Sequence, residues 1–131
     1  RRTGARISVG VHVPVRSRDE LEFHHVGLRA WDVQPDEDWV ADSKCWVTDP
    51  RNHPNRIEWL RYEPESTVPD VVKDTPHVAF KVDKLEPYLE GEDVVIEPFE
   101  VGDFARVAFI VKNGLVYEFM EFKPGASWFD G

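Results

Sequence analysis

Short runs of alternating hydrophobic and polar residues dominate the chain, and this period of two is typical of strands with one buried face. The clearest run has Ile or Val at positions 7, 9, 11, 13 and 15, separated by small or polar residues and by Pro14. Because proline cannot donate a hydrogen bond to a neighbouring strand, we expect this N-terminal strand at a sheet edge. The other strands predicted in the first half are residues 22–30, 45–48 and 56–63.

One short helix is predicted between residues 30 and 45. Pro35 is followed by three acidic residues and by an apolar run that begins at Trp39. A proline with acidic residues in the first turn favours the start of a helix. This helix must be short, because turn-forming residues follow at positions 49–55.

The second half has a clearer pattern, in which a strand and a helix precede three further strands. The helix is predicted to begin at Asp83, to run to about Leu89 and to end near Gly91. The dipeptide Asn113-Gly114 is a strong signal for a tight hairpin. The predicted strands are residues 76–82, 94–99, 105–112 and 115–122.

The two halves share a weak internal repeat. The sequence HVGL at His25 resembles HVAF at His77, and IEWL around Glu58 resembles YEFM around Glu118. Each half therefore opens with a histidine strand and closes with a glutamate strand. The segment from His25 to Glu58 is shorter than the segment from His77 to Glu118, and the difference is about the length of one strand with its turn. We expect the first half to lack one strand, and the N-terminal strand to fill the gap.

The four repeated residues are candidates for a metal site, because strand side chains alternate between two faces and these four fall in register. Two imidazoles and two carboxylates suit Zn, Ni, Co, Mn or Fe(II), and affinity order alone does not choose among them. Such a set can leave room for water, and a divalent ion can polarise a carbonyl or lower the pKa of a bound water. The sequence predicts one divalent ion bound by His25, Glu58, His77 and Glu118.

Each candidate also has a purely structural interpretation. Alternation allows only one of the neighbours His24 and His25 to face inward, and His24 takes the ligand place if the strand contains a bulge. His77 can simply begin a strand, and the glutamates can be solvated charges. Glu121 competes with Glu118, but three residues further on it should face the opposite side. The recurrence of the whole pattern in both halves favours the metal site.

These motifs resemble those of the vicinal oxygen chelate superfamily, which includes lactoylglutathione lyases, methylmalonyl-CoA epimerases, extradiol dioxygenases and the fosfomycin and bleomycin resistance proteins. The motifs at His25 and His77 are similar to its two metal-strand motifs, and YEFMEF at Glu118 is similar to its closing strand. Glu58 matches a position at which the ligand varies. The resemblance covers about residues 22–123.

The resemblance implies an α+β fold in which paired βαβββ modules form a curved, mostly antiparallel sheet around a metal pocket, with the first module abbreviated. The 131 residues, 41% of them hydrophobic, are enough for a single domain. Within it we expect an N-terminal strand and extension at residues 1–21, a first module at 22–66 and a second module at 75–123.

The predicted function is that of a metal-dependent isomerase, epimerase or lyase. The ion chelates vicinal oxygens of a hydroxy-carbonyl or keto-acid substrate and stabilises an enediolate, and Glu118 or Glu58 serves as the base. Two alternatives stay open. An Fe(II) dioxygenase uses two histidines and one carboxylate and commonly a longer chain. A metal-free binding or resistance protein has no need for the buried charge.

Arg29 and Lys81 stand four residues after His25 and His77, at matching places in the repeat and on the ligand face. Both are candidates for binding a substrate carboxylate or phosphate near the pocket rim. Alternatively, both reach solvent, since they lie roughly 13 Å from the histidines at about 3.3 Å per residue along a strand. Basic side chains are usually exposed.

Charge and cysteine content narrow the range of partners. The chain has 16 Lys and Arg against 25 Asp and Glu, a net charge of -9, which disfavours nucleic acid. No apolar run approaches the roughly 18 residues of a membrane span, and the single Cys45 permits no intrachain disulfide. We expect a cytoplasmic protein that binds a small molecule and, from the resemblance, forms a homodimer.

Overall fold

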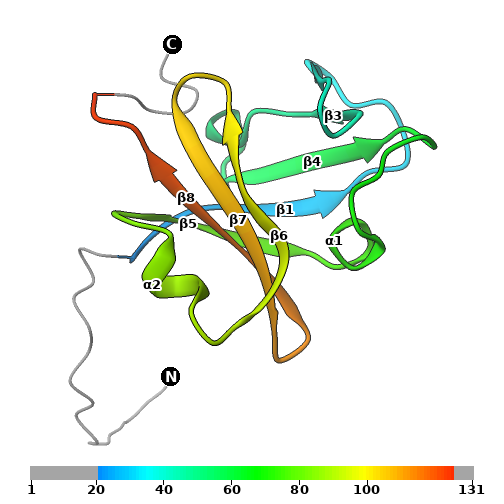
Figure 1. Ribbon diagram of the computed structural model, residues 1–131. Coiled ribbons are helices and arrows are strands. Elements are labelled where there is room, and N and C mark those ends of the chain that lie inside the picture. The colour runs from blue at the N-terminus through cyan, green and yellow to red at the C-terminus, as the bar shows by residue number, and fades with distance from the viewer. Residues whose placement is uncertain (1–20, 126–131) are drawn as a thin grey trace, which may run out of the picture.

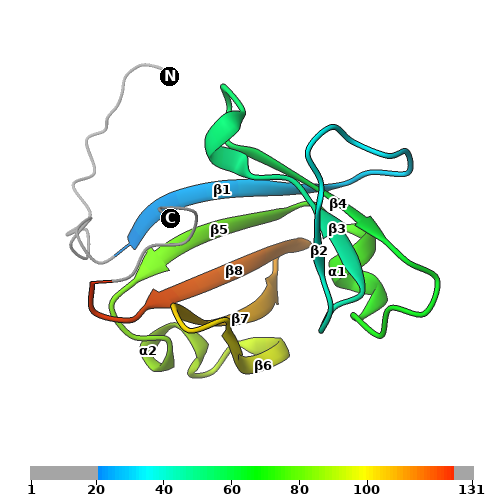
Figure 2. The same ribbon diagram turned by 90° about the horizontal axis from the view of Figure 1, so that it is seen from above.

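A computed structural model describes residues 21–125 of the chain, so the predicted strand at residues 7–15 lies outside it. In the described range eight strands form one curled sheet in the order β2-β3-β4-β1-β5-β8-β7-β6, and Figures 1 and 2 show its curvature. The strands are β1 (Leu21–Arg29), β2 (Asp38–Val40), β3 (Cys45–Val47), β4 (Ile57–Tyr62), β5 (His77–Val82), β6 (Asp93–Val101), β7 (Ala105–Lys112) and β8 (Leu115–Phe122).

The sheet consists of two halves with the same internal order, and this confirms the expected α+β fold of paired modules. β1 pairs with β4 in parallel, and β5 pairs with β8 in parallel. The two halves meet where β1 runs antiparallel to β5. The expectation that the first half lacks a strand is wrong, because each half contributes four strands. The first half is shorter because no helix follows β1 and because β2 and β3 have three residues each.

The prediction of a helix after Pro35 is also wrong, because this segment forms β2. Trp39 pairs with Trp46 and Val40 with Cys45, and the two indole rings lie 5.0 Å apart. The backbone hydrogen bonds to β3 and the contact between the indole rings therefore outweigh the local preference for a helix that Pro35 and the three acidic residues after it indicate.

The second half matches its prediction closely. α2 covers Glu86–Leu89, three residues later than the predicted start. Asn113 and Gly114 have φ angles of 55° and 79° between β7 and β8, as a tight hairpin requires. Two short elements were not predicted. These are the 3-10 helix η2 (Pro50–Asn52) and the helix α1 (Asp70–Asp74).

Hydrophobic side chains of the second half fill both faces of the sheet. On the outer face Leu85 and Tyr88 at α2 pack with Phe119 and Ile110. On the inner face Val72 of α1 belongs to a second cluster, with strand residues such as Met120. No helix among the described residues is long and apolar enough to cross a membrane.

Candidate metal centre

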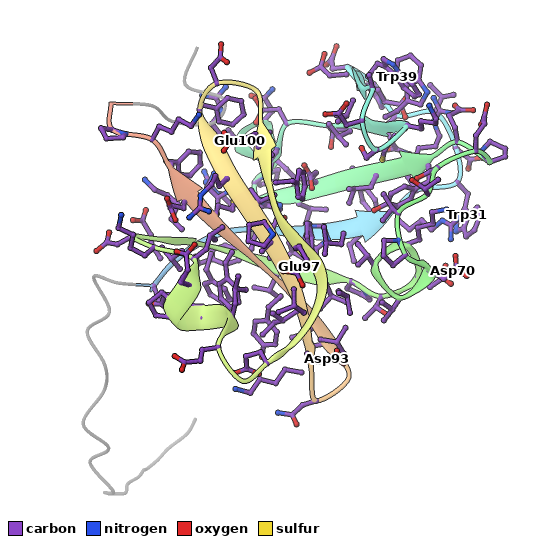
Figure 3. The ribbon with its side chains drawn as sticks, viewed as in Figure 1. Trp31, Trp39, Asp70, Asp93, Glu97 and Glu100 are labelled. Carbon is purple, nitrogen blue, oxygen red and sulfur yellow. The ribbon has the colours of Figure 1, made fainter. Side chains whose placement is uncertain are left out.

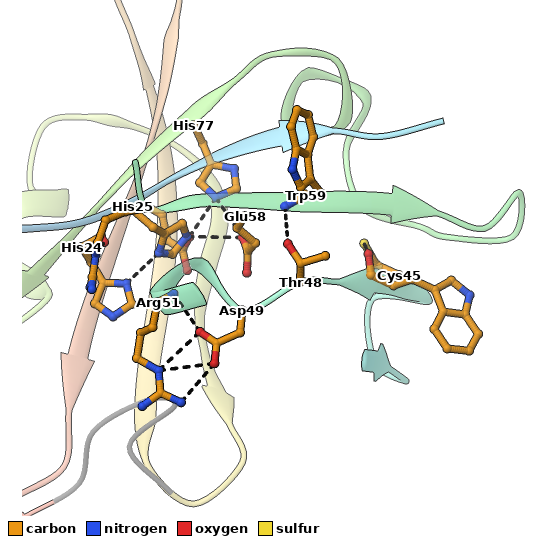
Figure 4. A network of polar contacts seen from close by, with 12 residues as sticks. His24, His25, Cys45, Thr48, Asp49, Arg51, Glu58, Trp59 and His77 are labelled. Atoms are coloured by element: carbon orange, nitrogen blue, oxygen red, sulfur yellow. Dashed lines mark hydrogen bonds and ion pairs between the residues drawn. The ribbon is translucent and has the colours of Figure 1, made fainter. Parts of the chain in front are cut away.

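Two histidines and two glutamates converge on the inner face of the sheet, one from each of the four central strands. His25 of β1, Glu58 of β4, His77 of β5 and Glu118 of β8 are 6% exposed or less. Nε2 of His25 lies 3.3 Å from Oε1 of Glu58 and 3.4 Å from Oε1 of Glu118. Nε2 of His77 lies 3.7 Å and 3.1 Å from the same two oxygens. Figure 4 shows His25, Glu58 and His77 pointing toward one another.

The strand register explains this convergence. Gly27 lies between Glu58 on one neighbouring strand and His77 on the other. Ala79 likewise lies between His25 and Glu118. Each row of the sheet thus carries one histidine and one glutamate around a small residue, and the two rows are adjacent on one face.

Gly27 has a specific steric role in this arrangement. A Cβ atom at this position would lie 2.0 Å from Cε1 and 2.4 Å from Nε2 of His77. The imidazole of His77 therefore lies directly over the backbone of β1, in space that any larger residue at position 27 would fill. The glycine in the HVGL motif is required by this close approach.

The ligand atoms are spaced as they are around a single ion. With metal–ligand bonds of about 2.1 Å, tetrahedral ligands lie roughly 3.4 Å from one another. The four histidine-to-glutamate distances run from 3.1 to 3.7 Å. In addition, Nε2 of His77 is buried and accepts no hydrogen bond from a described residue, so its lone pair is available to a metal. His25, Glu58 and His77 could therefore bind a metal. Glu118 is a further candidate, because its Oε1 lies 3.4 Å from Nε2 of His25 and 3.1 Å from Nε2 of His77.

Without an ion, protons balance the charges of the cluster. Burial lowers the pKa of an imidazole, but the contacts with Glu58 and Glu118 outweigh it, so the pKa of His25 rises to about 10 and that of His77 is also raised. Burial raises the pKa of Glu58 and Glu118, but their contacts with the two imidazoles have the larger effect, so the pKa of each glutamate is lowered. At neutral pH a metal ion must therefore displace protons from the histidines.

His24 lies behind His25 because β1 contains a bulge between Phe23 and His25. Both histidines are buried, and of the two it is His25 that contacts Glu58 and Glu118. Nδ1 of His24 lies 2.7 Å from Nδ1 of His25. Burial, His25 and Arg56 lower the pKa of His24 to about 4, so its ring is neutral at pH 7. It can accept the Nδ1 proton of His25 and leave the Nε2 lone pair of His25 for a metal.

A pocket of about 440 Å³ lies against this cluster, with Glu58, His77 and Glu118 in its wall. Most other lining side chains are apolar and come from both halves, among them Leu60 from β4 and Phe109 from β7. The ring of Phe109 contacts that of His77 at 5.5 Å between centroids. The volume and the apolar wall with a few polar groups are typical of small-molecule sites.

Arg29 and Lys81 do not line the pocket. The guanidinium of Arg29 forms an ion pair with Asp74 of α1, and Nζ of Lys81 lies 5.1 Å from the ring centre of Phe122. A role of these cations in substrate binding stays a prediction that the geometry does not support. Glu121 points away from the cluster, as expected, and accepts a hydrogen bond from the backbone N–H of Leu85.

Several pocket residues were not predicted from the sequence. Val68 and Val72, next to and within α1, line the wall together with Tyr62 at the end of β4. Pro69 followed by Asp70 was a usable signal for the start of this helix. No local signal indicates that the helix packs against the ligand strands, because that contact depends on the curvature of the sheet.

No family model matches the sequence, and no curated protein matches it either. Solved structures do match in fold. A hypothetical protein from Bacillus halodurans aligns with a TM-score of 0.59 and 18% identity, over 82% of this chain and 98% of that one. Methylmalonyl-CoA epimerase from Mycobacterium tuberculosis aligns with a TM-score of 0.55 and 16% identity, over 79% and 89%. At these identities the similarity shows the fold alone, so the chain has the curled-sheet α+β fold of glyoxalase-like proteins.

Proposed function

We propose that this protein is a metal-dependent isomerase, epimerase or lyase that acts on a small substrate with vicinal oxygens. The observation that carries the proposal is the spacing of two imidazoles from two carboxylates, with histidine-to-glutamate distances of 3.1 to 3.7 Å. Three of these four side chains, all but that of His25, lie in the wall of a largely apolar pocket. The fold of a known epimerase is a second, weaker support.

The side chains around the pocket have different roles in such a reaction. A divalent ion at the cluster supplies Lewis acidity, which makes a C–H bond next to a carbonyl more acidic. Glu58 and Glu118 enter the pocket wall from different halves of the sheet, so one can remove a proton and the other can return one. His25 and His77 serve as neutral ligands, and the apolar wall excludes water from the reacting carbon.

A metal-free binding protein is the second candidate. Two imidazolium rings and two carboxylates neutralise one another, as the raised pKa of His25 and the lowered pKa of Glu118 indicate. Such a cluster can exist as a purely structural element. An Fe(II) dioxygenase is less well supported, because both glutamates, rather than one, lie at ligand spacing.

Elemental analysis distinguishes the candidates when the protein is purified without affinity metal. We expect about one equivalent of a divalent transition metal per chain, lost in His77→Ala and in Glu118→Gln. Glu121→Gln is the matched control, because this glutamate lies on the same strand but outside the cluster. A wild-type chain that takes up no Zn, Ni, Co, Mn or Fe(II) on incubation contradicts the enzyme proposal.

The reaction class is tested by proton exchange. The metal-loaded protein is incubated in D₂O with a panel of hydroxy-carbonyl compounds, and deuterium at the carbon next to the carbonyl is followed by NMR. We expect exchange with at least one compound, and its loss in Glu58→Gln or Glu118→Gln. A loaded protein that catalyses no exchange across the panel contradicts carbon-acid chemistry.

The four candidate ligands converge within one chain. A homodimer and a cytoplasmic location are separate proposals. Light scattering on the purified protein tests the first, and fractionation of the source cells tests the second.

A further inference from the structure

The charges of the pocket wall indicate which ligands it accepts, an inference that rests on the proposed function. Within the described residues no lysine or arginine lines the pocket, and His77 is its one basic lining residue. Acidic residues, in contrast, are frequent. They are Asp38, Asp42, Glu58, Glu100 and Glu118.

The innermost part of the pocket does not attract an anion. Glu58 and Glu118 balance either two imidazolium rings or, with neutral imidazoles, one divalent ion. Glu100, labelled in Figure 3, is also balanced, because Nζ of Lys123 lies 2.8 Å from its Oε1. Among the described lining residues, the charge that remains unbalanced is that of Asp38 and Asp42.

Asp38 and Asp42 are exposed, and neither forms an ion pair within the described range. They stand on and just after β2, on one side of the pocket. A pocket lined by one sign of charge and by apolar side chains concentrates the field, so two uncompensated carboxylates act on a ligand that enters.

Two cations lie near the wall but outside its lining. Arg29 and Lys73 both approach the ring of Tyr62, at 5.7 and 5.8 Å, yet neither lines the pocket. Arg29 is paired with Asp74, and Nζ of Lys73 donates to the carbonyl of Ser66.

We propose that the pocket accepts largely apolar ligands that are neutral or positively charged, and that Asp38 and Asp42 reject anions. The substrate of the proposed reaction is then a hydroxy-carbonyl compound without phosphate or carboxylate groups, and an amine on it is tolerated. A keto-acid, or a coenzyme A ester with its phosphates, does not fit this wall.

Matched fluorescent probes test the proposal. N-phenyl-1-naphthylamine is neutral, and 8-anilinonaphthalene-1-sulfonate has the same rings with one negative charge. Dansylcadaverine and its N-acetyl derivative form a cationic and neutral pair. We expect the sulfonate to bind about threefold or more weakly than the neutral probe at low ionic strength, with a smaller difference at high salt. The cation should bind at least as tightly as its acetylated form.

The double variant Asp38→Asn/Asp42→Asn assigns the effect. We expect it to bind the sulfonate about threefold more tightly and the neutral probe unchanged. Asp93→Asn/Glu97→Gln makes the same change in net charge at exposed β6 residues that do not line the pocket, visible in Figure 3, and should leave both affinities unchanged.

Three results would overturn the proposal: equal affinity for sulfonate and neutral probes, no binding of the neutral probe, or a preference that survives the Asp38→Asn/Asp42→Asn change. Circular dichroism confirms that the variants are folded. Probe binding is measured with and without added Zn. A failure of charge selection is thereby distinguished from a failure of the proposed metal function, which the metal content of the chain reports.

Discussion

The two halves of the sheet contribute equally to the candidate site but not to the hydrophobic core. Each half provides one histidine, one glutamate and one small residue, and the two rows around the small residues Gly27 and Ala79 each combine side chains from both halves. The second half has strands of six to nine residues and the helix α2 on its outer face. The first half has two three-residue outer strands and leaves Trp39 45% exposed.

This difference shows which parts of the fold the site requires. The four candidate ligands lie on the four central strands, which are neighbours in the sheet. The outer strands and the covering helix can therefore shrink in one half without moving a ligand. The buried members of both core clusters lie in α1 and the second half, so we expect that half to contribute most of the stability.

The largest expected effect tests the asymmetry of the core. Phe119→Ala removes a ring that is 6% exposed and stacked 5.2 Å from Tyr88, and should cost about 3–5 kcal/mol of unfolding free energy. Trp39→Ala should cost about 1 kcal/mol or less, because its ring is half exposed on a short strand. Urea unfolding measures both. Equal costs would show that the halves share the core.

The next prediction concerns the protonation of His25, which contacts a glutamate from each half. The pKa of His25 is raised from 6.5 to about 10 in the folded metal-free chain, so its contribution to stability is complete below pH 6.5 and is lost as the pH rises toward 10. The melting temperature of the metal-free protein should fall by on the order of 10 °C between pH 6 and 9. Added Ni²⁺ should stabilise the protein more at pH 8 than at pH 6, because protons compete less for the imidazoles. A stabilisation by Ni²⁺ that is independent of pH would exclude binding through these histidines.

A smaller effect separates the two small residues at equivalent positions. Gly27→Ala places a methyl group within the ring of His77 and should lower metal affinity about a hundredfold. Ala79→Gly creates no clash and should cost only about 1 kcal/mol of stability, with the metal retained. Isothermal titration with Zn²⁺ compares the two. Normal affinity in Gly27→Ala would mean that His77 does not bind the ion.

The smallest effect concerns His24, which has no counterpart in the second half. His24→Phe keeps a ring but removes the acceptor for Nδ1 of His25, and should weaken metal binding about tenfold. His24→Asn places an oxygen near the same point and should restore most of the affinity. The visible spectrum of the Co²⁺ protein should shift in the first variant only. Identical spectra in all three proteins would leave His24 a packing residue.

The local sequence was sufficient to identify most strands and the candidate ligands. Alternation located β1, β4, β5, β7 and β8 within one or two residues, because a half-buried strand has to alternate. The repeated histidine and glutamate motifs were sufficient to predict that four distant side chains meet. Their function as metal ligands stays a prediction until the metal content is measured.

Tertiary contacts decided the features that the local sequence misrepresents. Pro35 and its acids favour a helix, yet pairing with β3 makes this segment a strand. The bulge before His25 lets the rings of two adjacent histidines come within 2.7 Å of each other, whereas simple alternation would place them on opposite faces. Arg29 matches Lys81 along the chain, but Asp74 on an unpredicted helix holds it outside the pocket.

The sequence by itself determined which residues have the chemistry for a metal site and on which strands they lie. The curvature of the sheet decided which charges surround the pocket, because it brings β2 with Asp38 and β6 with Glu100 to a common cavity. Alternation is a property of one strand and can be recognised within it. The composition of a pocket depends on segments that are distant in sequence, and only their packing brings them together.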